Sequence, residues 1–188
     1  MLWHHSSPAG ARASGGTPRT GARRGFSILE TCLATIIVGL SVLAIVRLIT
    51  AVTQQNFYAQ KTVTAEMLAN NIRELTAGLP FNDPANGTHL GPNPGQTTLA
   101  QYNDVEDLNG FVANPPVDAQ RQTIASLPDW QQSVTVTHVS PSNYSLSDSL
   151  PNDSACNLDR VRVTVSYRPP GTATWIPIVS MEWLKAKL

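Results

Sequence analysis

Residues 23–52 read RRGFSILETCLATIIVGLSVLAIVRLITAV, and this stretch decides how the chain is organised. Between Glu30 and Arg47 lie 16 uncharged, mostly apolar residues. As a helix that run is about 24 Å long, and a helix over residues 26–52 is about 40 Å long. The hydrocarbon core of a bilayer is about 30 Å thick. The stretch therefore predicts a membrane-spanning helix.

The charges on either side of this helix predict its orientation. All four arginines of the polar, Pro/Gly-rich residues 1–25 precede the first acidic residue, Glu30, whereas residues 26–188 hold 9 basic and 13 acidic residues. Positive charge before a span marks its cytoplasmic side, so the N-terminus is expected inside and the bulk of the chain outside. A transit peptide would need an amphipathic pattern that residues 1–25 lack. Because the net charge is +0, nothing points to nucleic acid as a partner.

Glu30 is unexpected in such a helix. A carboxylate costs about 2.5–3.5 kcal/mol at the bilayer centre and less near the interface. One interpretation is that its side chain reaches the headgroups. The other is that it pairs with a cation, such as the α-amine of a new N-terminus at Phe26 on a neighbouring subunit. The local physics leaves both interpretations open.

A basic leader, Gly25, Phe26, three residues, Glu30 and then an apolar helix resemble the prepilin signal of type IV pilins and type II secretion pseudopilins. The resemblance implies that a membrane aspartyl peptidase cuts after Gly25 and methylates the new amine of Phe26. It also implies that Glu30 neutralises the amine of an adjacent subunit during assembly. Residues 1–25 would then be a removed leader, longer than many in this family.

The helix is expected to continue beyond the membrane as an amphipathic segment over residues 53–79. Apolar residues recur there at helical spacing and predict a stripe that packs on a domain. The stripe consists of Ala65, Leu68, Ile72 and Leu75, with Phe57 two turns upstream. Gly78 and Pro80 are expected to end the helix. The alternative is two helices broken near residues 53–56.

Residues 80–188 are expected to form a globular extracytoplasmic head. Residues 80–130 are loop-rich, with a short helix or strand around residues 97–102. Alternating or apolar stretches predict strands at 133–139, 161–167 and 175–183, with Pro177 indicating an edge or a bulge. In residues 160–167 the alternation places Arg160, Arg162, Thr164 and Ser166 on the wet face. The predicted fold class is α+β, a long N-terminal helix packed on a small antiparallel sheet, which is also the pilin architecture.

Residues 102–111 gather acidic side chains ahead of an Asn-Gly pair. The oxygen-bearing residues could coordinate Ca²⁺, although their spacing does not match an EF-hand loop. The alternative is a turn in which these side chains bond the local backbone. The candidate calcium ligands are Asp104, Glu106, Asp107 and Asn109. The tract resembles one in minor pilins of the PilV type.

No catalytic constellation stands out in the sequence. His89 and His138 have no second histidine nearby and are interpreted as surface residues rather than metal ligands. No Gly-rich phosphate loop or nucleophile motif occurs. Cys32 lies in the membrane helix and Cys156 in the head, so they are not expected to pair, and three Asn-x-Ser/Thr matches are of a kind common by chance. The sequence therefore predicts a protein that is not an enzyme and has no cofactor.

The leading hypothesis is a structural subunit, a minor pilin or pseudopilin, of a type IV pilus-like filament. A minor pseudopilin of a type II secretion system is the alternative, and a membrane-anchored extracytoplasmic binding protein or enzyme is the alternative from a different class. The implied partners are the prepilin peptidase/N-methyltransferase, other pilins or pseudopilins, an inner-membrane assembly platform and membrane lipid. The expected location is the bacterial inner membrane, and afterwards a filament, the periplasm or the cell surface.

Overall fold

A computed structural model describes residues 25–83, 89–140 and 157–187. The chain divides into two compact units, the first ending at Ile49 and the second beginning at Thr50. The described residues form one long helix, two short 3₁₀ helices and an antiparallel sheet of four strands. This content agrees with the predicted α+β class.

Helix α1 runs from Ile28 to Ala77 without the break considered at residues 53–56. Its start is capped by Ser27, whose hydroxyl oxygen accepts a hydrogen bond from the Glu30 backbone N–H at 3.2 Å. Its end comes just before Gly78 and Pro80, as the sequence predicts. The Ser27 cap explains where the helix begins, and Gly78 and Pro80 explain where it ends. The absence of interior prolines explains why it is continuous.

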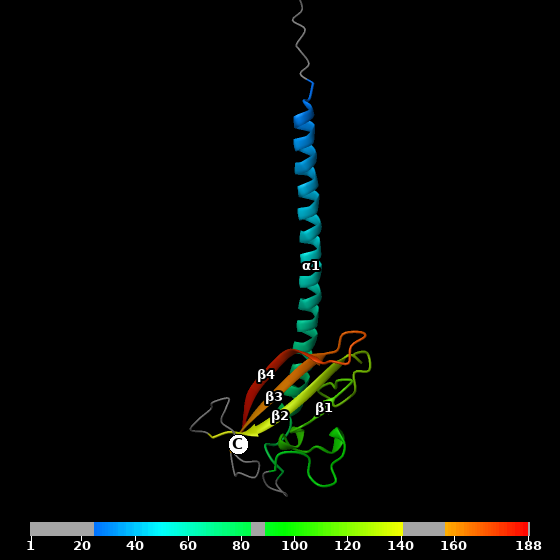
Figure 1. The fold of residues 1–188 in the computed structure, drawn as a ribbon. Helices are drawn as coiled ribbons and strands as arrows, with labels where there is room; N and C mark the ends of the chain where they lie inside the picture. Colours follow the sequence, from blue (N-terminus) through cyan, green and yellow to red (C-terminus); the bar gives the residue numbers. More distant parts are fainter. Residues whose placement is uncertain (1–24, 84–88, 141–156, 188) are drawn as a thin grey trace, which may run out of the picture. The chain divides into compact units, whose positions relative to one another are not determined.

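The sheet has the strand order β1-β2-β3-β4, and every neighbouring pair is antiparallel. Figure 1 shows β2, β3 and β4 beside the C-terminal part of α1. The three predicted strands are present and longer than expected, whereas β1 and the 3₁₀ helix η2 were not foreseen because they are too short for a periodic signal. The bounds are β1 Val112–Ala113, β2 Trp130–His138, β3 Leu158–Tyr167, β4 Ile176–Ala186, η1 Leu99–Gln101 and η2 Glu106–Leu108.

The hydrophobic core lies between the last turns of α1 and the inner faces of β2 and β3. The four predicted residues of the helix stripe are all buried there, together with Ala69. Phe57 is not part of the core, because its side chain is 53% exposed and stacks under the Lys61 ammonium group. The facing strand residues are Val134, Val136, Val161, Val163 and Val165.

Gln132 joins β2 to α1 by a hydrogen bond inside the core. Its side-chain amide donates hydrogen bonds to the backbone oxygens of Leu68 at 2.8 Å and Val117 at 3.0 Å. Its side-chain oxygen accepts one from the Val117 N–H at 2.8 Å. This buried glutamine therefore meets the rule that buried polar groups find partners.

Strand β4 is an edge of the sheet and pairs with β3. The register shifts between Val165 and Ser166, and Ser166 lies opposite Pro177. Both features confirm the prediction of an edge or a bulge at Pro177, since proline cannot donate hydrogen bonds to the sheet.

The polar side chains of β3 do not all face solvent. Arg162 is exposed and forms an ion pair with Glu182. The expectation that Arg160 and Ser166 also face solvent is wrong, because both residues are buried.

Candidate functional site

Gly25, Phe26 and Glu30 lie at the start of the described chain. Gly25 and Phe26 precede α1, and Glu30 stands in its first turn. The Phe26 side chain is 82% exposed, and a Cβ atom added at Gly25 would meet no heavy atom within 4 Å. This junction, the Gly25–Phe26 peptide bond, is accessible in the described part of the chain. A larger side chain at Gly25 would meet no obstacle.

The residues that follow the junction expose their apolar side chains on every side of the helix. The large apolar residues from Ile28 to Val52 are 46–85% exposed. By length and hydropathy this helix qualifies as a membrane span, and none of its most apolar window is buried in the protein. A helix that is apolar all round belongs in a bilayer or among other apolar helices rather than in water.

Glu30 has a role inside its own chain that the sequence reasoning missed. Its backbone N–H is capped by Ser27, so its carboxylate stands in the first helical turn. Negative charge is favourable there, because the unsatisfied N–H groups give a helix N-terminus a partial positive charge. The signal was present as Ser-x-x-Glu, the pattern of a capping box.

A second group of candidate side chains lies in the head. Glu106 comes from η2, His138 from the last residue of β2 and Asp159 from the start of β3. One donor atom of each lies within 4.8 Å of the other two. His138 and Asp159 are cross-strand partners, and the imidazole Nδ1 is 2.7 Å from the Asp159 Oδ1. The exposed fractions of the three residues are 1%, 0% and 0%.

The expectation that His138 lies at the surface is wrong. In a strand, alternate residues share a face, and His138 is in phase with Gln132, Val134 and Val136, which are all buried. Asp159 is in phase with the buried Val161 on β3. The alternation of side chains along β2 and β3 would therefore have predicted that both residues are buried.

Burial dominates the electrostatics of this cluster. It raises the pKa of Glu106 to about 7; the Asp159 carboxylate also raises this pKa, whereas the His89 N–H and His138 lower it. The Glu106 Oε2 accepts a hydrogen bond from the His89 N–H at 3.0 Å, and its Oε1 has no partner among the described residues. Burial likewise raises the pKa of Asp104 to about 6.

The other three candidate calcium ligands bond backbone amides. Asp104 accepts a hydrogen bond from the Asp107 N–H at 2.9 Å, and Asn109 accepts one from the Val136 N–H at 3.1 Å. Asp107 accepts one from the Asn103 N–H at 2.8 Å. The bonds of the two aspartates are those of a capped turn, whereas the Asn109 bond joins this segment to β2. A calcium ion bound by the four residues stays a prediction.

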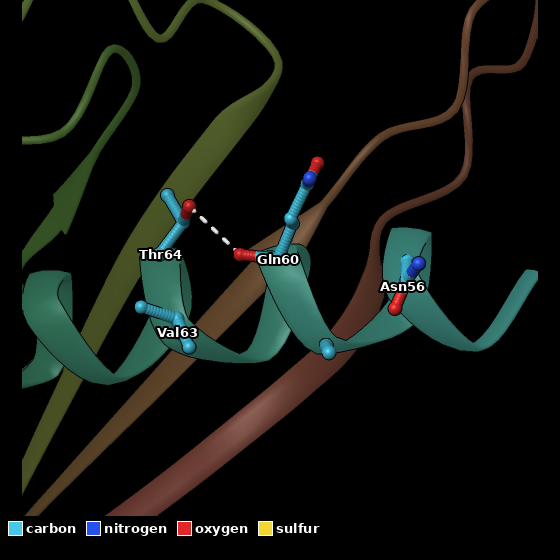
Figure 2. Close-up of a pocket in the computed structure, with 5 residues that line it drawn as sticks. Asn56, Gln60, Val63 and Thr64 are labelled. Atoms are coloured by element: carbon cyan, nitrogen blue, oxygen red, sulfur yellow. Dashed lines mark hydrogen bonds between the residues drawn. The ribbon is translucent and has the colours of Figure 1, made fainter. Parts of the chain in front are cut away.

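A shallow pocket lies on α1, and Figure 2 shows the side chains that line it. They occupy successive turns, and the Thr64 hydroxyl donates to the Gln60 backbone oxygen at 3.0 Å. None of them is ionisable. Its lining is Asn56, Ala59, Gln60, Val63 and Thr64. Cys156 and the three asparagines of the Asn-x-Ser/Thr matches lie outside the described residues.

Comparison with known proteins identifies no relative: no family model, no curated protein and no solved structure matches this chain.

Proposed function

We propose that this chain is a structural subunit, a minor pilin or pseudopilin, of a type IV pilus-like filament. The observation that carries the proposal is the state of α1, whose residues 28–60 are all exposed while its last turns belong to the core of the head. An apolar helix left without partners needs lipid first and neighbouring helices later. A subunit that is stored in a membrane and then extracted into a fibre meets these two environments in turn, lipid in the membrane and neighbouring helices in the fibre.

The junction supports the same proposal through its charges. Between Gly25 and Val46 the only charged side chain is that of Glu30. Cleavage after Gly25 would create an α-amine at Phe26, four residues before Glu30, a spacing of about 6 Å along the axis where these residues are helical. A neighbouring subunit shifted by about one turn would place its amine beside this carboxylate. The pair would remove two unpaired charges from an apolar environment and fix the stagger between subunits.

Processing is the first experiment. The full chain is expressed in a bacterium that has a prepilin peptidase, and the membrane fraction is analysed by intact mass and N-terminal peptide mass. The expected mature chain begins at a singly methylated Phe26. A mature chain that keeps residues 1–25, or one that is cut after the apolar run, would contradict the proposal.

A matched pair of glycine variants separates processing from folding. A Cβ atom meets nothing within 4 Å at either Gly25 or Gly39, so neither site resists a larger side chain within the chain. Gly25→Leu is expected to leave uncleaved precursor in the membrane, because the peptidase must accommodate the residue before the cut bond. Gly39→Leu is expected to be cleaved normally. Equal cleavage of both variants would argue against a cut after Gly25.

A further inference from the structure

The Glu106–His138–Asp159 cluster brings together donors from three separate elements. The imidazole and the two carboxyl groups are all buried, and their donor atoms lie within 4.8 Å of one another. Two carboxylates and an imidazole removed from water are costly unless a positive charge or protons compensate them. The cluster therefore favours either shared protons or a positive ion among its donor atoms.

The hydrogen bonds of the cluster leave one donor atom clearly available. The Glu106 side chain is held by the His89 N–H through one oxygen, while its other oxygen, Oε1, lacks a partner in the described chain. A buried acceptor without a partner is costly, and more so when it is charged. An ion bound at this point would use Oε1 and would leave the bond to His89 intact.

We propose that Glu106, His138 and Asp159 bind one divalent transition-metal ion of the Zn²⁺ class. An imidazole nitrogen together with carboxylate oxygens suits Zn²⁺ and its neighbours, whereas Ca²⁺ and Mg²⁺ prefer oxygen ligands alone. Three protein donors leave the fourth position of a tetrahedral ion for water. This inference does not depend on the proposed filament function.

To take such an ion, the donor atoms, which lie within 4.8 Å of one another, would move to the spacing that the ion sets. Zn²⁺ binds nitrogen and oxygen donors at about 2.0–2.2 Å, so two donors on a tetrahedral ion are about 3.4 Å apart. The His138 Nδ1 and the Asp159 Oδ1, now 2.7 Å apart, would separate by about 0.7 Å as the ion replaces the proton between them. Binding therefore releases a proton to solvent.

The ion would join a loop to the sheet. Glu106 belongs to the segment that leads from α1 to β1, while His138 and Asp159 form a cross-strand pair of β2 and β3. The segment already contacts β2 through the Gly110 N–H, which donates to the Val134 oxygen at 3.1 Å. A metal bond would add a further link at the end of the same strand pair.

The experiment uses the full-length, tag-free chain in detergent after treatment with a chelator. Zn²⁺ is added, free metal is removed, and bound zinc per chain is measured by elemental mass spectrometry; the dissociation constant comes from competition with a chromophoric chelator. The expected result is about one Zn²⁺ per chain, with excess Ca²⁺ failing to displace it. Absence of stoichiometric zinc, or displacement by Ca²⁺, would overturn the proposal.

Variants place the zinc at the cluster. Glu106→Gln and Asp159→Asn keep the shape of the side chain and remove its charge, and each is expected to weaken zinc binding by at least about 10-fold. His138→Gln tests the imidazole and distinguishes this site from His4 and His5. Asp107→Asn is the matched control, since Asp107 is buried beside Glu106 but outside the cluster, and its zinc affinity should equal that of the unchanged protein.

The remaining outcomes are also decisive. Unchanged zinc affinity in the Glu106, His138 and Asp159 variants would mean that the cluster only shares protons, and the proposal would fall. Where a variant does not fold, as judged by circular dichroism, the absorption spectrum of the unchanged protein with Co²⁺ decides instead. Intense d–d bands of a tetrahedral ion without thiolate ligands are expected, and a spectrum of free aqueous Co²⁺ would refute the site.

Discussion

Residues 28–52 of α1 expose their large apolar side chains, whereas the inner face of β2 and β3 buries Gln132, His138 and Asp159. The two regions depart from the usual partition of side chains in opposite directions. Exposed apolar surface of this extent indicates an environment other than water. Buried polar groups need partners inside the protein. Gln132 finds them in the backbone, and the ionisable cluster requires a proton or an ion.

The largest effect is expected from removing the exposed apolar segment. The buried core residues of α1 begin at Ala65, so a chain that starts at Thr53 keeps the whole described core. We expect the full chain to sediment with membranes and to need detergent, and the shortened chain to be soluble with the circular dichroism of mixed helix and sheet. Aggregation of the shortened chain would show that residues 26–52 are needed for the head itself.

The next effect concerns the single charge in the apolar segment. Glu30→Gln should still insert and be cleaved, but its incorporation into filaments should be severely reduced, because one unpaired buried charge costs about 3–5 kcal/mol. Cross-linking to co-expressed partner pilins, scored beside the processing state, measures incorporation.

Two controls accompany the Glu30 experiment. Glu66→Gln removes an exposed carboxylate further along α1 and should be incorporated normally. Glu30→Asp keeps the charge and should retain part of the incorporation. Normal incorporation of Glu30→Gln would mean that the carboxylate only complements the charge of the helix N-terminus or reaches the headgroups.

In the head, a substitution at Gln132 measures how much a buried, fully hydrogen-bonded polar group contributes to the free energy of unfolding. Gln132→Leu leaves the N–H and C=O groups of Val117 without the side chain that now bonds both, and we expect a loss of about 2–4 kcal/mol in the free energy of unfolding. Denaturant unfolding followed by circular dichroism measures it. Gln131→Leu, at the half-buried neighbour on the other face, should change stability by less than about 1 kcal/mol.

The smallest change in stability is expected from an ion pair that is partly exposed to solvent. The ion pair of Arg162 with Glu182 is partly exposed, with 44% and 27% of the two side chains accessible. Arg162→Ala should therefore cost only about 0–1 kcal/mol. A double-mutant cycle with Glu182→Ala isolates the pair, and a coupling energy as large as the Gln132 effect would contradict this ranking of exposed and buried contacts.

Local periodicity explains how much of the fold was predictable. The buried helix stripe and the strands β2 and β3 follow from repeats of about four or of two residues. The end of α1 at Ala77 follows from Gly78 and Pro80, and β4 follows from a mostly apolar stretch. Phe57 was assigned to the stripe by spacing alone, but it lies beyond the turns of α1 that join the core, and Lys61 stacks on it instead. Spacing along a helix does not tell where its partner surface ends.

The candidate site was predicted only in part, for a related reason. Glu106 was singled out as an oxygen ligand, but it was grouped with its sequence neighbours. The structure groups it with His138 and Asp159. Neighbours along a turn point in different directions and bond backbone amides, whereas residues distant in sequence converge on the inner face of the sheet.

By itself, the sequence determined that this protein has an apolar helix with Glu30 in its first turn and strands whose alternate residues face a core. These properties depend on residues within a few positions of one another, so they can be recognised without a fold. Only the tertiary structure decided that Glu106 meets His138 and Asp159. Their meeting depends on the register of β2 against β3 and on the path of the segment before β1. Contacts between elements distant in sequence set both, and no local pattern records them.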